Sequence, residues 1–194
     1  MPRIIAGSKK SLILEGPKGQ NVRPTYDRTK ENLFNIISAR YPIEESYVLD
    51  VFSGTGSIGL ECLSRGAKQA VFIDKDISLT KRNIVKCGFS DSARTIQSDW
   101  QSALRILKKE NKKFTHIFLD PPYNTGLYER IIENSDLYDI MGNNSVVIAE
   151  LSEKDIVLEN PAKLVLTDKR RYGICVFAFY IKGNYEDLDM SGKF

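Results

Sequence analysis

The chain has 194 residues, of which 42% are hydrophobic and 27% are charged, and this composition excludes collagen-like, mucin-like and wholly disordered proteins. No apolar run reaches the roughly 18 residues of a membrane helix, and the first seven residues lack the apolar stretch of a secretion signal. The three cysteines lie far apart and lack the spacing of metal ligands, so we expect a cytoplasmic protein with no metal and no membrane partner.

The net charge of +3 is unevenly distributed along the chain. Residues 1–40 contain eight basic and three acidic residues, whereas the rest contains 20 basic and 22 acidic ones. A basic segment on a near-neutral body is typical of a protein that binds a polyanion, although a solvated basic face has the same signature. The candidate contacts to a nucleic acid are Arg3, Lys9, Lys10, Arg23 and Arg28.

The predicted elements begin with a short hairpin within residues 1–20 and a helix over 27–40 that Pro42 ends. Apolar, strand-like runs then alternate with helical patterns. Strands are predicted at 48–52, 70–73, 95–97, 116–119 and 146–150, and helices at 57–65, 78–87, 100–109 and 127–134. Such alternation favours a parallel sheet that is covered on both faces by helices.

The end of the chain departs from this rhythm. Two strand-like runs, 163–166 and 174–181, are joined by a predicted loop over 167–173 with no helix between them, so the last strand should be antiparallel. The sequence thus predicts an α/β, Rossmann-like, doubly wound fold with a mostly parallel sheet of about seven strands. We divide it into an N-terminal hairpin extension (1–20), a main domain (21–183) and a frayed polar tail (184–194).

A glycine-rich loop follows the first predicted strand of the alternating region. Its spacing, Gly54-x-Gly56-x-x-Gly59, matches the fingerprint of a nucleotide-cofactor loop, and Asp74 ends the next strand about 20 residues later. An acidic residue at that place can accept hydrogen bonds from the two hydroxyl groups of an adenosine ribose. The pattern fits either a nicotinamide cofactor or S-adenosylmethionine, and a tight turn that binds nothing is the structural alternative.

The tetrad Asp120-Pro121-Pro122-Tyr123 directly follows the fourth predicted strand. Its two prolines make the loop stiff, and the carboxyl end of a strand is where open α/β sheets bind ligands. The Asp120 carboxylate and the Pro121 carbonyl can accept the two hydrogens of a nucleobase amine, which leaves the nitrogen lone pair directed at an electrophile. Tyr123 can stack on the base. A proline turn without a ligand is the alternative reading, and whether Asp120 also acts as a base stays open.

With these motifs the chain resembles the class I S-adenosylmethionine-dependent methyltransferases, and among them the RsmD type. The resemblance extends to about Lys182. It rests on Arg3–Gly7, Arg23–Thr25, Asp27-Arg28, Glu31–Asn35, Asp50–Gly59, Ser64–Ala67, Asp74, Asp120–Tyr123 and Tyr172-Gly173. It implies an enzyme that methylates the exocyclic N2 amine of a guanine in 16S ribosomal RNA, within a small ribosomal subunit or its assembly intermediate. A monomer that uses S-adenosyl-L-methionine and no metal is expected.

The resemblance also assigns roles to particular residues. Those expected to hold the cofactor are Asp50, Phe52, Ser53, Gly54, Thr55, Gly56, Asp74, Lys75, Asp99 and Trp100. Among these, Asp74 is implied on the ribose and Asp99 near the adenine amine, and Trp100 lies either against the adenine or in the core. The implied catalytic residues are Asp120, Pro121, Pro122 and Tyr123.

Three other functions remain open at this point. A DNA adenine-N6 methyltransferase would use the same tetrad, but a chain of this length leaves little room for a target-recognition domain. A nicotinamide-dependent oxidoreductase would explain the glycine loop and give Asp120–Tyr123 no task. A non-catalytic RNA-binding module would have no need for an intact tetrad and glycine loop.

Overall fold

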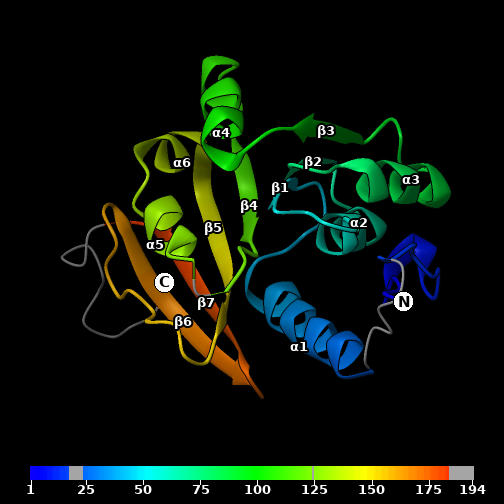
Figure 1. The fold of residues 1–194 in the computed structure, drawn as a ribbon, viewed down its shortest axis with the longest axis horizontal. Coiled ribbons are helices and arrows are strands. Elements are labelled where there is room, and N and C mark those ends of the chain that lie inside the picture. The colour runs from blue at the N-terminus through cyan, green and yellow to red at the C-terminus, as the bar shows by residue number, and fades with distance from the viewer. Residues whose placement is uncertain (18–23, 124, 184–194) are drawn as a thin grey trace. The chain divides into compact units, whose positions relative to one another are not determined.

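The computed structural model describes residues 1–17, 24–123 and 125–183 (Figure 1). Backbone contacts divide the chain into two compact units, Met1–Ala103 and Leu104–Phe194. The first unit contains the short 3-10 helix η1 (Gly7–Lys9), helices α1 (Pro24–Arg40), α2 (Ser57–Ser64) and α3 (Ser78–Cys87), the start of α4 (Trp100–Lys109), and strands β1 (Tyr47–Val51), β2 (Gln69–Asp74) and β3 (Ala93–Gln97). The second contains strands β4 (Phe114–Leu119), β5 (Met141–Ser152), β6 (Leu164–Tyr172) and β7 (Cys175–Lys182), and helices α5 (Leu127–Ile132) and α6 (Ser135–Ile140).

The strands of the first unit form a parallel ladder. Strand β2 lies between β1 and β3, with Asp50 opposite Phe72 and Phe72 opposite Thr95. The interior residues of β1 and β2 are buried, as expected for parallel strands that have side chains packed on both faces. This burial explains why β2 appears in the sequence as an apolar run over residues 70–73, and β1 as an apolar run that is interrupted by Asp50.

Helix α2 packs unusually close to this ladder at Gly59. A Cβ atom at this position would lie 2.3 Å from the Phe72 ring, which is itself fully buried. Glycine is therefore the residue that lets the helix approach β2. Because α2 begins directly after the glycine loop, this contact also fixes the end of that loop.

The strands of the second unit end in an antiparallel hairpin. Strands β4 and β5 are parallel, whereas β7 pairs antiparallel with both β5 and β6. Figure 1 shows β5, β7 and β6 side by side, with β6 last. The hydrogen-bonded strand order is β3-β2-β1 within the first unit and β4-β5-β7-β6 within the second. The predicted fold, a mostly parallel α/β sheet of about seven strands with an antiparallel last strand, is confirmed.

Two predicted boundaries in the second unit are wrong. The helix predicted over 127–134 ends at Ile132, and a second helix follows because the Asn134 side chain accepts a hydrogen bond from the Asp136 amide at 2.9 Å. The predicted loop 167–173 is strand as far as Tyr172. Its charged side chains lie on an edge strand, where they can be exposed to water. A charged edge strand has the polar composition of a loop, and for this reason the sequence alone predicted a loop here.

The expected N-terminal hairpin is a compact arm, which we define as residues 1–17. It has a single antiparallel bridge, Arg3 to Ile13, and a 3-10 turn at its tip. The rest of the predicted hairpin lies outside the described residues, and the predicted domain boundaries stay predictions. Within the described part of the chain, no helix is both long and apolar enough to cross a membrane.

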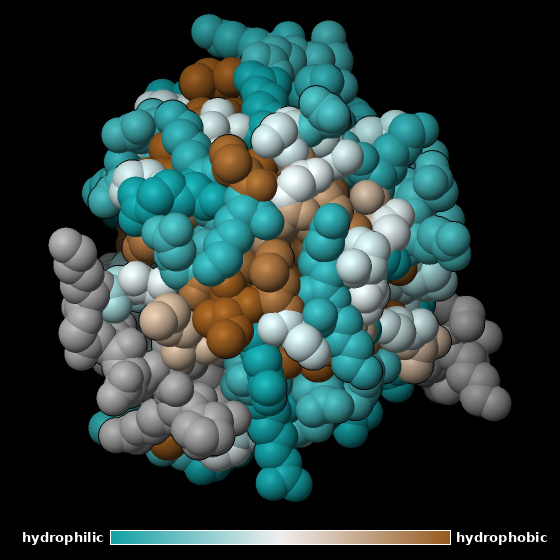
Figure 2. All heavy atoms as spheres, turned by 90° about the vertical axis from the view of Figure 1, so that its right-hand side faces the viewer, coloured by the Kyte–Doolittle hydropathy of each residue, from teal (hydrophilic) through white to brown (hydrophobic). Residues whose placement is uncertain are grey.

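The surface has a mixed character. On the face in Figure 2, brown hydrophobic areas alternate with teal hydrophilic ones. The strongly exposed large hydrophobic side chains of the first unit include Met1, Ile13 and Val85. Single exposed apolar residues of this kind are normal on soluble domains and do not by themselves mark a binding surface.

Candidate functional site

The glycine loop leaves β1 through a strained residue. Phe52 has a φ of 67°, a left-handed conformation that is unusual for an aromatic residue. The Ser53 amide donates to the Ile73 carbonyl at 3.0 Å, and the Gly56 amide donates to the Ser53 carbonyl at 2.6 Å. Strain of this type persists where the surrounding contacts enforce it, and it is common at ligand sites.

The loop presents open backbone at Gly54, beside the carboxylate of Asp74. The Gly54 amide donates to Asp74 Oδ2 at 2.8 Å, so the end of β2 and the loop are in direct contact. A Cβ atom at Gly54 would meet only the Phe52 carbonyl oxygen, at 4.0 Å. The backbone is therefore accessible next to a half-exposed acidic group, which is the arrangement that a nucleoside with ribose hydroxyl groups requires.

Asp50 lies in a different environment, buried in β1. Its Oδ2 atom accepts a hydrogen bond from the Gly59 amide at 2.9 Å. Burial raises the pKa of Asp50 to about 7, although the Gly59 hydrogen bond opposes this rise. The carboxyl group thus connects β1 to the start of α2.

Helix α3 holds the glycine loop through side chains that sequence reasoning missed. Thr80 Oγ1 donates to the Gly54 carbonyl at 2.8 Å and lies 3.1 Å from Ser53 Oγ. Asn83 Nδ2 donates to the Thr55 carbonyl at 2.9 Å. Both side chains are fully buried. The sequence does contain a signal for this contact. Thr80 and Asn83 are polar, lie three positions apart on one face of the predicted helix, and follow soon after Asp74.

The remaining cofactor candidates of the first unit have distinct surroundings. Asp99 caps α4 by accepting from the Ser102 amide at 3.0 Å, and this bond lowers the pKa of Asp99. Trp100 is only 6% exposed and lies in the core, whereas Lys75 is exposed. The expected contacts of all three with a cofactor stay predictions.

The basic arm is held against α2 and α1 by a buried charge cluster. Glu61 of α2 accepts from the Ile5 and Ala6 amides at 2.7 and 2.9 Å and forms ion pairs with Lys30 at 3.2 Å and Arg65 at 2.8 Å. Lys30 is buried and also donates to the Arg3 carbonyl at 2.6 Å. This cluster fixes the backbone of the arm.

Most of the candidate RNA contacts are accessible. Arg3 is exposed and forms an ion pair with Asp27 at 2.8 Å, and Lys10 and Arg28 are exposed. Lys9 is half-buried, with its ammonium group 5.7 Å from the centre of the Phe89 ring. Arg23 lies outside the described residues.

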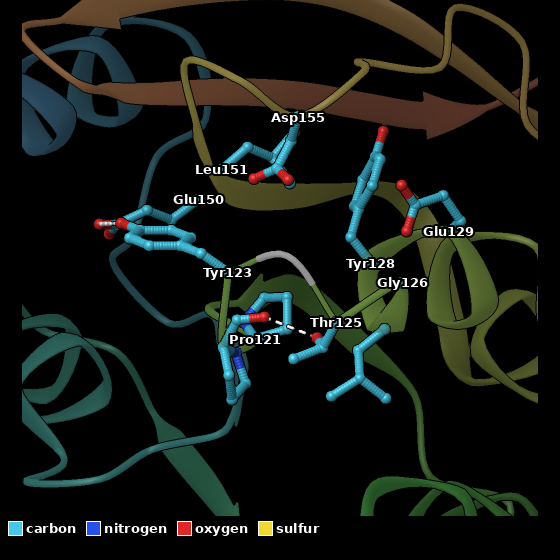
Figure 3. Close-up of a pocket in the computed structure, with 11 residues that line it drawn as sticks. Pro121, Tyr123, Thr125, Gly126, Tyr128, Glu129, Glu150, Leu151 and Asp155 are labelled. Atoms are coloured by element: carbon cyan, nitrogen blue, oxygen red, sulfur yellow. Dashed lines mark hydrogen bonds between the residues drawn. The ribbon is translucent and has the colours of Figure 1, made fainter.

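The second unit carries the proline-rich loop directly after β4. Asp120 is exposed, Pro121 is buried, and Thr125 Oγ1 closes the turn by donating to the Pro122 carbonyl at 2.6 Å. The loop borders a small, open hollow (Figure 3). Residues of the β5 end and of α5 complete its lining, among them Glu150, Asp155 and Tyr128. Of the four predicted catalytic residues, Pro121, Pro122 and Tyr123 line the hollow, and Asp120 directly precedes them at the end of β4.

Tyr123 is anchored at its hydroxyl group. It donates to Glu150 Oε1 at 3.1 Å, and its side chain is 42% exposed (Figure 3). Burial and the neighbouring Glu150 raise the pKa of Tyr123, and burial raises the pKa of Glu150 and of the nearby Cys175 thiol. The phenol therefore stays protonated and can keep donating. Sequence reasoning missed Glu150, although a lone acid at the end of an apolar strand was a visible signal.

Comparison with known proteins defines the class of this chain. The model of a family described as "Conserved hypothetical protein 95" matches residues 2–181. The chain belongs to this family, the RsmD-type methyltransferases.

Relatives match over almost the whole chain. "Ribosomal RNA small subunit methyltransferase D" of Haemophilus influenzae is 35% identical over 92% of this chain and 92% of its own length. The protein of the same name from Escherichia coli K12 is 29% identical over 92% and 88%. A solved structure of a hypothetical protein from Thermus thermophilus has a TM-score of 0.76 at 27% identity, covering 92% of this chain and 98% of that one. SMU.776, solved in complex with SAH (S-adenosylhomocysteine), shares the fold at 13% identity, with a TM-score of 0.62 over 82% of this chain and 50% of its own.

The buried Asp50 predicts a pH-dependent stability. An unfolded aspartate has a pKa near 3.8, so the folded protein retains a proton that the unfolded chain has released between pH 4 and pH 7. Stability from this group is therefore present at low pH and lost as pH rises through about 7. Relative to Asp50→Asn, the unmodified protein should lose about 3 kcal/mol of unfolding free energy between pH 5 and pH 8. Urea unfolding of both proteins measures this difference, and parallel pH curves would contradict it.

Proposed function

We propose that this protein is an S-adenosylmethionine-dependent methyltransferase that acts on the exocyclic N2 amine of a guanine in ribosomal RNA of the small subunit. The observation that carries the proposal is the Asp120–Tyr123 turn, which directly follows β4 and has a partly exposed aromatic ring fixed by Glu150. The names of the relatives from Haemophilus influenzae and Escherichia coli support ribosomal RNA of the small subunit as the substrate.

The first unit would hold the methyl donor. The open backbone at Gly54 and the carboxylate of Asp74 fit the amino-acid part and the ribose of S-adenosylmethionine, respectively. To bind the ribose, Asp74 would share its oxygens between the hydroxyl groups and the Gly54 amide, since a carboxylate accepts several hydrogen bonds. When bound, S-adenosylmethionine supplies an electrophilic methyl group on a sulfonium. The complex of SMU.776, a protein with this fold, with S-adenosylhomocysteine is in line with the assignment.

The second unit would present the acceptor. The Asp120 carboxylate and the Pro121 carbonyl would each accept one hydrogen of the base amine, which favours a pyramidal nitrogen with its lone pair free to react. Tyr123 would stack on the extruded base, a contact worth roughly 1–3 kcal/mol. The Asp120 carboxylate and the Pro121 carbonyl belong to one stiff turn, so little conformational entropy is lost when they orient the amine for reaction. A base that is splayed out of its helix fits such a turn better than a paired one.

The surrounding particle would provide much of the specificity. Each of the two compact units is assigned above to one part of the reaction, the donor to the first and the acceptor to the second. We therefore propose an assembled or partly assembled small subunit as the substrate, with Arg3, Lys10 and Arg28 of the first unit contacting phosphates. Such contacts make binding sensitive to salt.

Asp120 provides the most direct test of the acceptor role. Replacement by alanine removes one of the two amine acceptors, so methyl transfer to small subunits should fall at least about a hundredfold. The affinity for S-adenosylhomocysteine, measured by calorimetry, should stay unchanged because the proposed role of Asp120 is to accept from the base amine and not to bind the donor. Transfer at the rate of the unmodified protein would reject the assigned role.

Tyr123 separates stacking from anchoring. Tyr123→Phe keeps the ring and loses the hydrogen bond to Glu150, so the kcat/KM for RNA should fall about tenfold. Tyr123→Ala removes the ring as well, so its kcat/KM for RNA should be lower by at least about a further tenfold. Tyr47→Phe, at the start of β1 with 39% exposure, is the matched control and should leave transfer unchanged. Equal losses in the two Tyr123 variants would argue against stacking.

A further inference from the structure

Asn83 connects two parts of the first unit that are far apart in the sequence. It lies on α3, is fully buried, and has its whole amide group in use. Its Oδ1 atom accepts from the Glu15 amide at 2.7 Å, and its Nδ2 atom donates to the Glu15 carbonyl at 3.0 Å and to the Thr55 carbonyl at 2.9 Å. One side chain thus holds both the backbone of Glu15 in the basic arm and the glycine loop.

Two neighbouring side chains on α3 make contacts that differ from those of Asn83. Thr80, one turn earlier on α3, donates to the Gly54 carbonyl of the glycine loop. Arg82, the preceding residue, forms an exposed ion pair with Glu15 of the arm at 2.7 Å. Helix α3 therefore allows three contacts to be compared: Thr80 binds the loop, Arg82 binds the arm, and Asn83 binds both.

A second connection runs in parallel between the arm and the start of α2. Lys30 Nζ donates to the Arg3 carbonyl at 2.6 Å and to Ser57 Oγ at 3.1 Å. Ser57 is the first residue of the helix that follows the glycine loop. The arm is consequently tied to the loop region at both of its ends, near Arg3 and at Glu15, by buried polar groups. Buried polar groups of this kind are expensive to leave unpaired, so the two segments favour one another's conformation.

We propose that Asn83 is a positioning residue that couples the N-terminal arm to the methyl-donor loop, so that the docked arm holds the loop in its donor-binding shape. This inference rests on the proposed function, because it assigns the glycine loop to the methyl donor. By linkage, a methyl donor that binds the loop must also stabilise the docked arm. The basic arm then does more than contact RNA, since its position and donor binding support one another.

Asn83→Ser tests the coupling with Arg82→Ala as the matched control. Serine is small and polar but too short to reach both segments, so the dissociation constant for S-adenosylhomocysteine should rise about tenfold by calorimetry. In transfer assays the KM for the methyl donor should rise with little change in kcat, because no reacting atom is touched. Arg82→Ala removes an exposed ion pair to the same Glu15 and should change neither value. Equal affinity in Asn83→Ser and the unmodified protein would overturn the proposal, as would equal weakening in both variants.

Hydrogen–deuterium exchange of the unmodified protein tests the coupling without a substitution. Addition of S-adenosylhomocysteine should slow exchange of the Glu15 amide severalfold, although this amide belongs to the arm and not to the loop. The Lys112 amide, bonded to the Leu107 carbonyl at 3.0 Å in the second unit, serves as the control and should not change. Protection confined to the loop would reject the coupling and keep the proposed function. Failure of the unmodified protein to bind S-adenosylhomocysteine would instead reject the proposed function, and this inference with it.

Discussion

The first unit depends on how the backbone of the glycine loop is fixed. Carbonyl groups of consecutive loop residues are taken up by Thr80 and Asn83, while the Gly54 amide is bonded to Asp74. Below the loop, the Gly59–Phe72 contact and the Gly59–Asp50 hydrogen bond set the position of α2. With its carbonyl groups held by the protein, the loop can keep the strained φ of Phe52 and leave Gly54 open toward a ligand.

In the second unit, the contacts of the Asp120–Tyr123 turn fix the aromatic ring of Tyr123 at the surface. A tyrosine that is partly exposed has several rotamers available, and stacking on a base is effective only in one orientation. The hydrogen bond to Glu150 restricts that choice, and burial, which raises the pKa of Tyr123, keeps the phenol protonated so that it can donate. The two prolines fix the backbone on one side of the ring, and β5 provides the anchor on the other.

Much of this arrangement could be predicted from the sequence, because it depends on residues that are close to one another along the chain. The apolar runs of β1 and β2, the glycine spacing and the Asp120–Tyr123 tetrad each depend on neighbouring residues, and their placement at strand ends follows from the α/β alternation. The contacts that Asn83, Glu61 and Glu150 make with residues 27 to 68 positions away could not be predicted in this way, because no local pattern records such distant partners. The strand extension over Thr167–Tyr172 was missed for a related reason, because pairing with β7 outweighs the loop-like polarity of its side chains.

The central claim is that Asp120–Tyr123 presents a guanine N2 amine of ribosomal RNA to a methyl donor. The most direct measurement incubates the unmodified protein with small ribosomal subunits and isotopically labelled S-adenosylmethionine, digests the RNA to nucleosides, and identifies the labelled species by mass spectrometry. The account predicts that the label appears as N2-methylguanosine. Label in adenosine, in DNA offered as a competitor, or in no nucleoside at all would contradict it.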